Sequence, residues 1–177
     1  KQVITADMLT VNLLAIGAIF LMLLVSLRSV LLPAVLVLVI ETAIWINLSV
    51  PYFADQYLYY ISYIIISSIQ LGATVDYAIL LTSRYLEERI RVGRMDAVRK
   101  AVQSTTLPIL TSASILTLGG TTLGVYSSHG VVSQLGYLVG RGAVPAALLV
   151  LLVLPALLYL LDPLIWKPTR RLQAAFP

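Results

Sequence analysis

Residues 58–83 read LYYISYIIISSIQLGATVDYAILLTS and decide the fold. Asp76 is the only charged residue in this stretch. A helix needs about 20 mostly apolar residues to cross a bilayer, so this stretch is long enough to span one. It predicts a transmembrane helix that carries a carboxyl group at membrane depth.

The rest of the chain repeats this apolar pattern. Of its 177 residues, 59% are hydrophobic and 11% are charged, against about 25% charged in soluble domains. A secretory signal peptide would have a shorter apolar core followed by a polar mature domain, and the sequence fits neither feature. We expect an all-α, polytopic membrane helix bundle with one transmembrane domain over residues 1–177. The expected spans are about 8–27, 30–50, 58–83, 107–126 and 134–161.

Basic residues gather on one side of the predicted membrane. The connections on that side hold Arg28, the block Arg84–Lys100 and the segment Lys167–Arg171, whereas those on the other side hold only Lys1. Short connections rich in Lys and Arg stay in the cytoplasm. We therefore expect a multi-pass protein with its amino terminus outside and its carboxyl terminus in the cytoplasm.

The charged segment between the third and fourth spans has its own pattern. Glu87 and Arg91, and likewise Asp96 and Lys100, are four residues apart, a spacing that supports a helix. We expect an amphipathic helix over about residues 86–104, lying on the cytoplasmic membrane surface. It either serves as a linker that sets the topology or has a regulatory, lipid-sensing role.

Asp76 is the strongest candidate for chemistry. It lies eight residues before Arg84, about 12 Å from the inner boundary at 1.5 Å per residue. An ionised Asp at a helix centre costs about 2.5–3.5 kcal/mol, and a low dielectric favours the neutral acid, which suits a proton carrier. Ser68, Gly72 and Asp76 recur every four residues, so we expect this stripe to face the bundle interior. The alternative is a structural Asp that never titrates.

Tyr77 follows Asp76 directly. Adjacent residues on a helix point about 100° apart, so the two side chains leave the helix on different faces. We expect the Tyr77 hydroxyl to serve another helix or another subunit.

Further polar residues within the spans are candidates for a proton relay or for structural support. Glu41 lies about 16 Å from the inner turn, close to the level of Asp76. Arg141 is either an interfacial anchor or a buried counter-ion. A row of hydroxyl groups on one helix face either relays protons or joins helices. This row consists of Thr111, Ser114, Thr117 and Thr121.

Glycines at four-residue spacing predict close helix packing. The pairs Gly120/Gly124 and Gly136/Gly140 match the pattern that lets two backbones approach in lipid, and Gly72 is a further small position. In the last span, Pro145 and Pro155 predict kinks.

Several function classes find no support in the sequence. There is no nucleotide-binding loop of the G-x-x-x-x-G-K-[ST] type, no H-E-x-x-H motif and no G-x-S-x-G motif. Without cysteines, disulfides and cysteine-ligated metals are excluded. We expect no catalytic residues, no metal, no cofactor and no nucleic-acid partner.

Four segments together resemble the MMPL-type transporters of the resistance-nodulation-division superfamily. Gly72–Arg89 (GATVDYAILLTSRYLEER) is similar to the signature of the fourth transmembrane helix in that family. The similarity continues through Leu110–Ser114 (LTSAS), Leu135–Gly142 (LGYLVGRG) and Leu154–Leu158 (LPALL). It covers most of the chain.

The resemblance implies an architecture and a function. Members have two similar halves, each with six helices and a large extracytoplasmic domain after the first. The chain is similar to the last five helices of one half, so we expect a fragment from the second half of a longer bacterial protein. The family's proton relay uses Asp–Tyr pairs that reach between the halves, which maps onto Asp76 and Tyr77. The implied function is proton-driven export of lipid or other hydrophobic substrates across a bacterial plasma membrane.

The implied partners are the bilayer, the hydrophobic substrate, and either the other half or further copies of the chain. Two alternatives stay open. The SecD/SecF subunits of protein export are half-sized and carry a similar Asp helix, although small or polar residues usually follow the Asp, where this chain has Tyr77. The other alternative is a membrane scaffold domain that transports nothing and is held together by its glycine faces.

Overall fold

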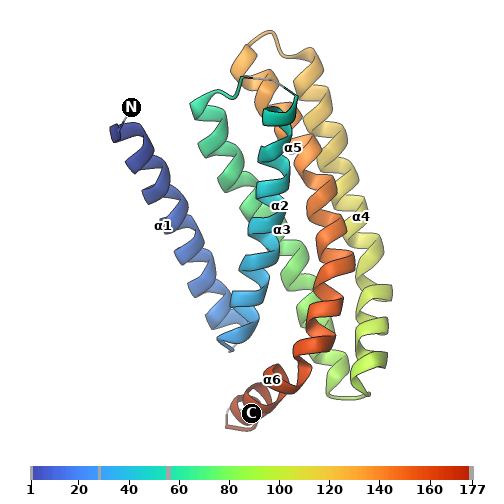
Figure 1. Cartoon of the computed structure of the whole chain (residues 1–177). Coiled ribbons are helices and arrows are strands. Elements are labelled where there is room, and N and C mark those ends of the chain that lie inside the picture. Colours follow the sequence, from blue (N-terminus) through green and yellow to red (C-terminus); the bar gives the residue numbers. More distant parts are fainter. Residues whose placement is uncertain (1, 28, 55–56, 176–177) are drawn as a thin grey trace.

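The computed structural model describes residues 2–27, 29–54 and 57–175, and their side chains over 10–27, 29–54 and 57–164. All regular structure in these residues is helical. Figure 1 shows long helices that run alternately up and down, with the amino terminus and the carboxyl terminus at opposite ends. The elements are α1 (Gln2–Leu27), α2 (Leu31–Phe53), α3 (Tyr60–Arg89), α4 (Arg94–Tyr126), α5 (Gly130–Leu148), the π-helical segment η1 (Leu149–Val153) and α6 (Leu154–Ala175).

Five helices are long and apolar enough to cross a membrane, which confirms the predicted number. Four of them are Thr10–Leu27 within α1, then α2, α3 and α4, and the fifth runs from Gly130 to Leu164. α3 and α4 have 30 and 33 residues, or about 45–50 Å at 1.5 Å per residue. Because a bilayer core is about 30 Å thick, both helices extend beyond it.

The predicted surface helix over 86–104 is wrong. α3 continues to Arg89, a short turn follows, and α4 begins at Arg94 and runs without a break to Tyr126. Gly93 precedes α4 in an extended conformation (φ −64°, ψ 161°), and nothing between Arg94 and Pro108 stops the helix once it has started. The charged segment therefore forms the ends of two spanning helices that project from the membrane.

The helices α4 and α5 cross at the predicted glycines. A methyl group at Gly140 would lie 2.9 Å from the Thr117 carbonyl oxygen, and one at Gly120 would lie 2.7 Å from Gly140 Cα. Nearby, the Ser133 hydroxyl donates a 2.6 Å hydrogen bond to the Gly124 carbonyl oxygen. The two backbones are therefore in direct contact at Gly120, Gly124, Gly136 and Gly140.

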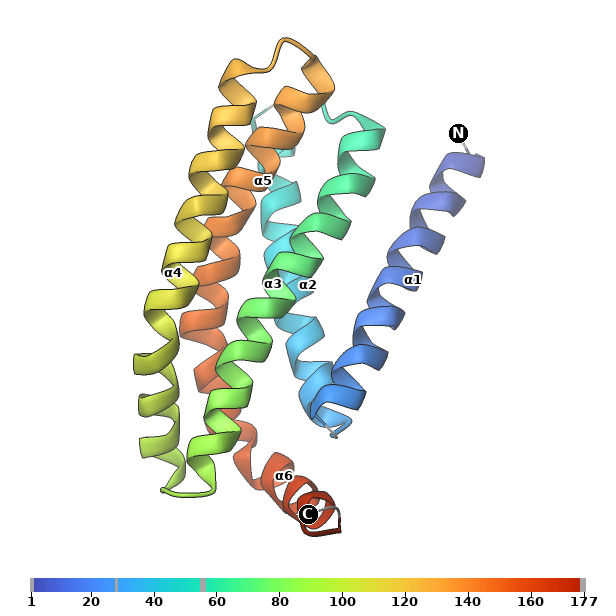
Figure 2. The same cartoon turned by 180° about the vertical axis from the view of Figure 1, so that it is seen from behind.

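The last span changes its hydrogen-bond pattern between the two prolines. The segment Leu149–Val153 is π-helical, and the Leu154 N–H bonds the carbonyl oxygen five residues earlier, at Leu149. Pro155, which follows, has no N–H to donate. Such wider turns accommodate backbone groups that a proline leaves unpaired. In Figures 1 and 2, α6 bends away from the bundle towards its carboxyl end.

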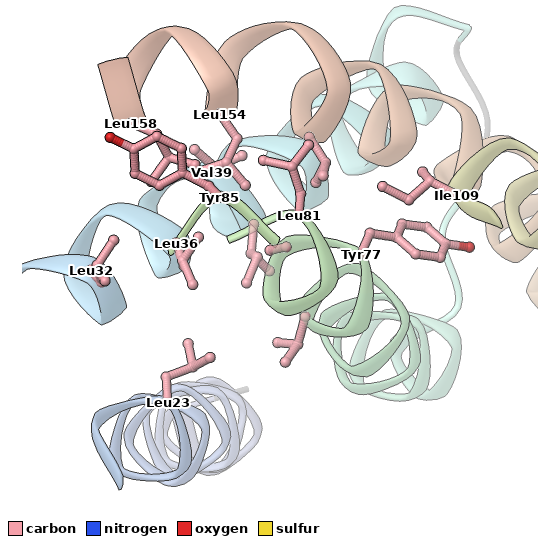
Figure 3. Close-up of a cluster of buried hydrophobic side chains, with 14 of the residues drawn as sticks. Leu23, Leu32, Leu36, Val39, Tyr77, Leu81, Tyr85, Ile109, Leu154 and Leu158 are labelled. Carbon is pink, nitrogen blue, oxygen red and sulfur yellow. The ribbon is translucent and has the colours of Figure 1, made fainter. Parts of the chain in front are cut away.

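Buried apolar side chains from all the spans meet in one core. α1 contacts α2 and α3, and in Figure 2 its amino-terminal half leans away from the other helices. Leu23 of α1, Leu36 of α2, Leu81 of α3 and Leu158 of α6 belong to one cluster of buried side chains, which Figure 3 shows. Each of these four is at most 1% exposed. Packing around α3 therefore fixes which of its faces stays open.

Candidate functional site

Asp76 lies on the open face of α3. Its side chain is exposed, as are Gly72 one turn earlier and Ser68 two turns earlier, and no atom lies within 4 Å of a methyl group placed on Gly72. Among the described residues, none bonds or pairs with Asp76. The expectation that this stripe faces the bundle interior is wrong, and Gly72 packs against no other described helix.

The opposite face of α3 explains this orientation. Val75, Ala78 and Leu81 are each at most 3% exposed and pack into the core. The polar residues Gln70 and Thr74 on that face are also buried. These larger side chains make more van der Waals contacts with the neighbouring helices than Ser68 and Gly72 would, and such packing drives helix association in lipid. The small, polar stripe is therefore left outside the five helices.

Tyr77 points elsewhere, as its position after Asp76 predicts. It is 6% exposed and donates a 3.2 Å hydrogen bond to the Ser112 hydroxyl of α4. Figure 3 shows its ring directed toward α4, near Ile109. The structure thus separates Asp76 from Tyr77, and Ser112, which sequence reasoning did not single out, is the partner of the tyrosine.

The hydroxyl row on α4 does not meet Asp76. The Thr111 hydroxyl donates to the Leu107 carbonyl oxygen at 2.8 Å, and the Thr121 hydroxyl donates to the Thr117 carbonyl oxygen at 2.7 Å. These hydroxyls donate to backbone carbonyl oxygens of their own helix, and Ser114 is exposed. The structure brings none of the row into contact with the carboxyl group.

Arg141 belongs to a buried polar network that joins α5 to α2 and α3. Its Nε donates to Asn47 Oδ1 at 3.0 Å and its Nη2 to the Asn47 carbonyl oxygen at 3.1 Å. Asn47 Nδ2 donates to Gln70 Oε1 at 2.7 Å and to the Leu138 carbonyl oxygen at 2.9 Å. Gln70 Nε2 in turn donates to the carbonyl oxygens of Ala43 and Gly142. Asn47 and Gln70 were not singled out from the sequence, although both are polar residues inside predicted spans.

Glu41 lies apart from this network. It is half-buried, and its Oε1 atom is buried without a hydrogen-bond partner in the described residues. No described contact joins it to Arg141 or to Asp76. The structure therefore does not bring the two acids into one polar interior.

A cavity of about 790 Å³ lies between α2, α4 and α5. Arg141, Thr117 and Thr121 reach its wall, and most of the remaining lining is apolar. It is separate from the open face of α3, since no residue of α3 lines it.

A second polar cluster closes the opposite end of the bundle. Asp162 accepts hydrogen bonds from the Tyr85 hydroxyl and from Arg89, whose Nε lies 2.9 Å from Asp162 Oδ1. Tyr85 is fully buried and Asp162 is 4% exposed. On the neighbouring surface, Arg84 pairs with Glu87 at 2.8 Å, with both side chains more than half exposed.

No metal site accompanies these clusters in the described part of the chain. Nowhere in it do three His, Asp or Glu side chains come together in a group that could hold a metal ion.

The fold and these sites define a polytopic helical membrane domain with a carboxyl group on its third spanning helix. The family model of the MMPL family matches residues 1–176, and the chain belongs to that family. It is 32% identical over 168 residues to the membrane protein SCO0839 of Streptomyces coelicolor, covering 92% of this chain and 24% of the relative. The chain thus spans about a quarter of that relative's length. No solved structure matches it.

Family membership confirms the resemblance to MMPL-type proteins, whose members are typically transporters rather than enzymes. It favours this assignment over the SecD/SecF alternative. The chain is therefore a multi-pass membrane domain of the MMPL family, embedded in a lipid bilayer.

Proposed function

We propose that the chain is the transmembrane domain of a proton-driven exporter of lipid or other hydrophobic substrates, with Asp76 as the proton carrier. The observation that carries this proposal is the position of Asp76. It lies on the open face of the spanning helix α3, with no partner among the described residues.

The position of Asp76 along α3 determines how costly its negative charge is. It lies 16 residues after Tyr60 and 13 before Arg89, about 24 Å and 20 Å from the two ends of α3. It is therefore near the middle of the helix, where an ionised Asp facing lipid costs about 2.5–3.5 kcal/mol. Asp76 must be neutral, or water or protein must cover it.

A second transmembrane unit fits the open face of α3. Ser68 and Gly72 leave a shallow, small-residue stripe beside Asp76, the kind of surface against which another helix packs closely in lipid. The unit is either the other half of a longer protein or a second copy of this chain. The relative in Streptomyces coelicolor, four times as long as the matched part, has room for such a second unit.

Proton movement through Asp76 can supply useful energy. The membrane potential is worth about 2.3 kcal/mol per charge per 100 mV. Neutralising Asp76 removes the need to solvate a charge between the two units, so their relative position can change. The resemblance suggests that the resulting movement drives export of a lipid or another hydrophobic molecule.

Tyr77 enters the proposal as a second relay residue. Its partner Ser112 is exposed on α4, so the Tyr77 hydroxyl lies close to the surface of the bundle. An acid of the second unit could reach it there, in agreement with the pairing between halves that the resemblance implies.

The distribution of basic residues supports a cytoplasmic location for the α3–α4 turn. Arg84, Arg89, Arg91 and Arg94 lie around this turn. By the positive-inside rule, we infer that the amino terminus faces outward and the carboxyl terminus inward, in a bacterial plasma membrane.

The scaffold alternative has less support. It depended on glycine faces that could hold other proteins, but Gly120, Gly124, Gly136 and Gly140 are occupied by the crossing of α4 with α5 inside this chain. Of the packing glycines, only Gly72 remains available for a partner.

Proton flux by the full-length protein tests the proposal. The protein is reconstituted into liposomes with an imposed pH gradient, and internal pH is followed with a fluorescent dye. We expect Asp76→Asn to abolish flux. Asp96→Asn is the matched control, because Asp96 is an exposed Asp in the first turn of α4, and it should retain flux. Equal flux in the wild-type and Asp76→Asn proteins would refute the proton-carrier role.

A further inference from the structure

Three side chains form an ionic lock between α3 and α6. Asp162 Oδ1 accepts hydrogen bonds from the Tyr85 hydroxyl and from Arg89 Nε, and Asp162 Oδ2 accepts one from Arg89 Nη2 at 3.0 Å. The side chain of Arg89 is 20% exposed and that of Asp162 is 5% exposed. Tyr85, Arg89 and Asp162 are called the inner lock below.

The chemistry of the inner lock makes it hard to open. An Arg fork that donates to both oxygens of a carboxylate combines charge with fixed geometry, and the tyrosine hydroxyl occupies a third acceptor position. Separating such a pair leaves an uncompensated charge in a buried place, which is far more costly than breaking an exposed ion pair. The inner ends of α3 and α6 are therefore held together.

Neighbouring contacts tie the α3–α4 turn into the same assembly. Arg89 Nη1 donates to the Val92 carbonyl oxygen at 3.3 Å. The Arg94 guanidinium lies 4.5 Å from the centre of the Tyr159 ring, and Lys100 Nζ lies 3.2 Å from Glu88 Oε2. The start of α4 is thus fixed to both α3 and α6.

The helix that leads into the lock changes its hydrogen-bond pattern before it reaches Asp162. In η1 (Leu149–Val153) the backbone hydrogen bonds join residues five apart in place of four, and Pro155 contributes no N–H in the next turn. On the other side of η1, α5 is held against α4 by the crossing at Gly120 and Gly140. One continuous helical path is therefore held at both ends, and its hydrogen-bond pattern changes between them.

We infer that the inner lock makes the inner half of α3 and α6 a single moving unit, with η1 as the hinge between this unit and α5. This inference rests on the proposed function and deepens it. Asp76 lies nine residues before Tyr85 on α3, so a displacement of α3 that follows a change in its charge passes through the lock to α6. Asp162 is then a positioning residue, since it acts through Arg89 and Tyr85.

Distances between spin labels in the full-length protein test this inference. The chain has no cysteine of its own, so labels attach only at introduced ones if the remainder of the protein is also cleared of cysteines. Ser83→Cys with Leu160→Cys reports on the lock, and Val144→Cys with Leu160→Cys spans the hinge. Leu160 and Val144 are 68% and 47% exposed, so both sites accept a label.

We expect Asp76→Asn, which mimics the neutral acid, to move the hinge pair by about 1–2 Å, the usual size of a helix shift. The lock pair should not move. With Asp162→Asn also present, the hinge pair should stop responding and the lock pair should broaden. Glu87→Gln is the matched control, since it breaks only the exposed pair with Arg84, and it should change neither distance.

Two outcomes of the distance measurements would overturn the inference. A hinge pair that still responds to Asp76→Asn when Asp162→Asn is present would overturn the inference, as would a lock pair that moves while the lock is intact. If Asp162→Asn does not fold, Arg89→Gln replaces it as the variant that breaks the lock. The charge swap Arg89→Asp with Asp162→Arg should then restore the response of the hinge pair, and restored coupling in the swap supports the lock. Lost flux with no distance change in Asp76→Asn contradicts the hinge alone, whereas unchanged flux contradicts the proposed function.

Discussion

Neighbouring glycines in α4 provide a sharp test of the α4–α5 crossing. A methyl group at Gly119 has no atom within 4 Å, whereas one at Gly120 would lie 2.7 Å from Gly140 Cα and 2.8 Å from the Gly136 carbonyl oxygen. Ordinary contacts of this kind are 3.4–4 Å long. Because the opposing atoms are backbone, no side chain can rotate to make room, and the two helices must separate.

The size of the effect follows from two contributions. Replacing Gly by Ala within a helix stabilises it by about 0.8–1 kcal/mol, and this gain applies at both positions. Overpacking a close contact costs about 1–3 kcal/mol, and this loss applies only at Gly120. We therefore expect Gly119→Ala to be slightly stabilising and Gly120→Ala to be less stable than Gly119→Ala by about 3 kcal/mol, the upper end of that range.

The assay is reversible unfolding of the purified protein in mixed micelles of detergent and SDS, followed by tryptophan fluorescence. The difference between the two variants isolates the contact, because the helix propensity term is shared. Equal stabilities of Gly119→Ala and Gly120→Ala would refute the reasoning, since the two backbones could not then be in contact.

Three further predictions concern polar contacts and the open face of α3. Asn47→Leu should destabilise the bundle by about 3 kcal/mol in the same unfolding assay, because it leaves Arg141 without its acceptors, and adding Arg141→Leu should recover part of the loss. Additive losses in that double variant would contradict the coupling. Tyr77→Phe and Ser112→Ala should each cost about 1 kcal/mol and together no more than either alone, since they remove one shared hydrogen bond. Gly72→Leu should not destabilise this chain, because nothing lies near Gly72, yet it should lower proton flux by the full-length protein; flux equal to that of wild type would count against a packed partner there.

The number of spans and the glycine crossing follow from local sequence patterns. Apolar length alone marks each spanning helix, and the spacing of Gly120 and Gly124 marks a face that admits a second backbone. The surface helix over 86–104 was mispredicted because charge indicates contact with water but not whether a helix stops. A short turn at residues 90–93 separates the two helices in that region, so the charged residues on either side of it extend α3 and α4.

The orientation of α3 could not be read from its own residues. In a membrane, lipid-facing and core-facing positions are equally apolar, so periodicity does not distinguish them. The stripe with Ser68, Gly72 and Asp76 suits the interior of one bundle as well as the boundary between two units. Its open position results from the way the other helices pack around α3.

Contacts between polar residues far apart in the chain could not be predicted from the sequence either. Arg141 and Asn47 are 94 residues apart in the chain, and Arg89 and Asp162 are 73 apart. No local spacing rule connects such residues, and only the crossing of the helices brings them together. The sequence does place each of them within or beside a span, where a partner is expected.

The protonation of Asp76 in the membrane tests the central claim most directly. Infrared difference spectra of the full-length protein in lipid can detect the carbonyl band of a protonated carboxyl group, and Asp76→Asn identifies which band belongs to Asp76. We expect a band of a protonated carboxyl group in the wild-type protein that is missing in Asp76→Asn. Spectra from which Asp76→Asn removes no such band would contradict the account.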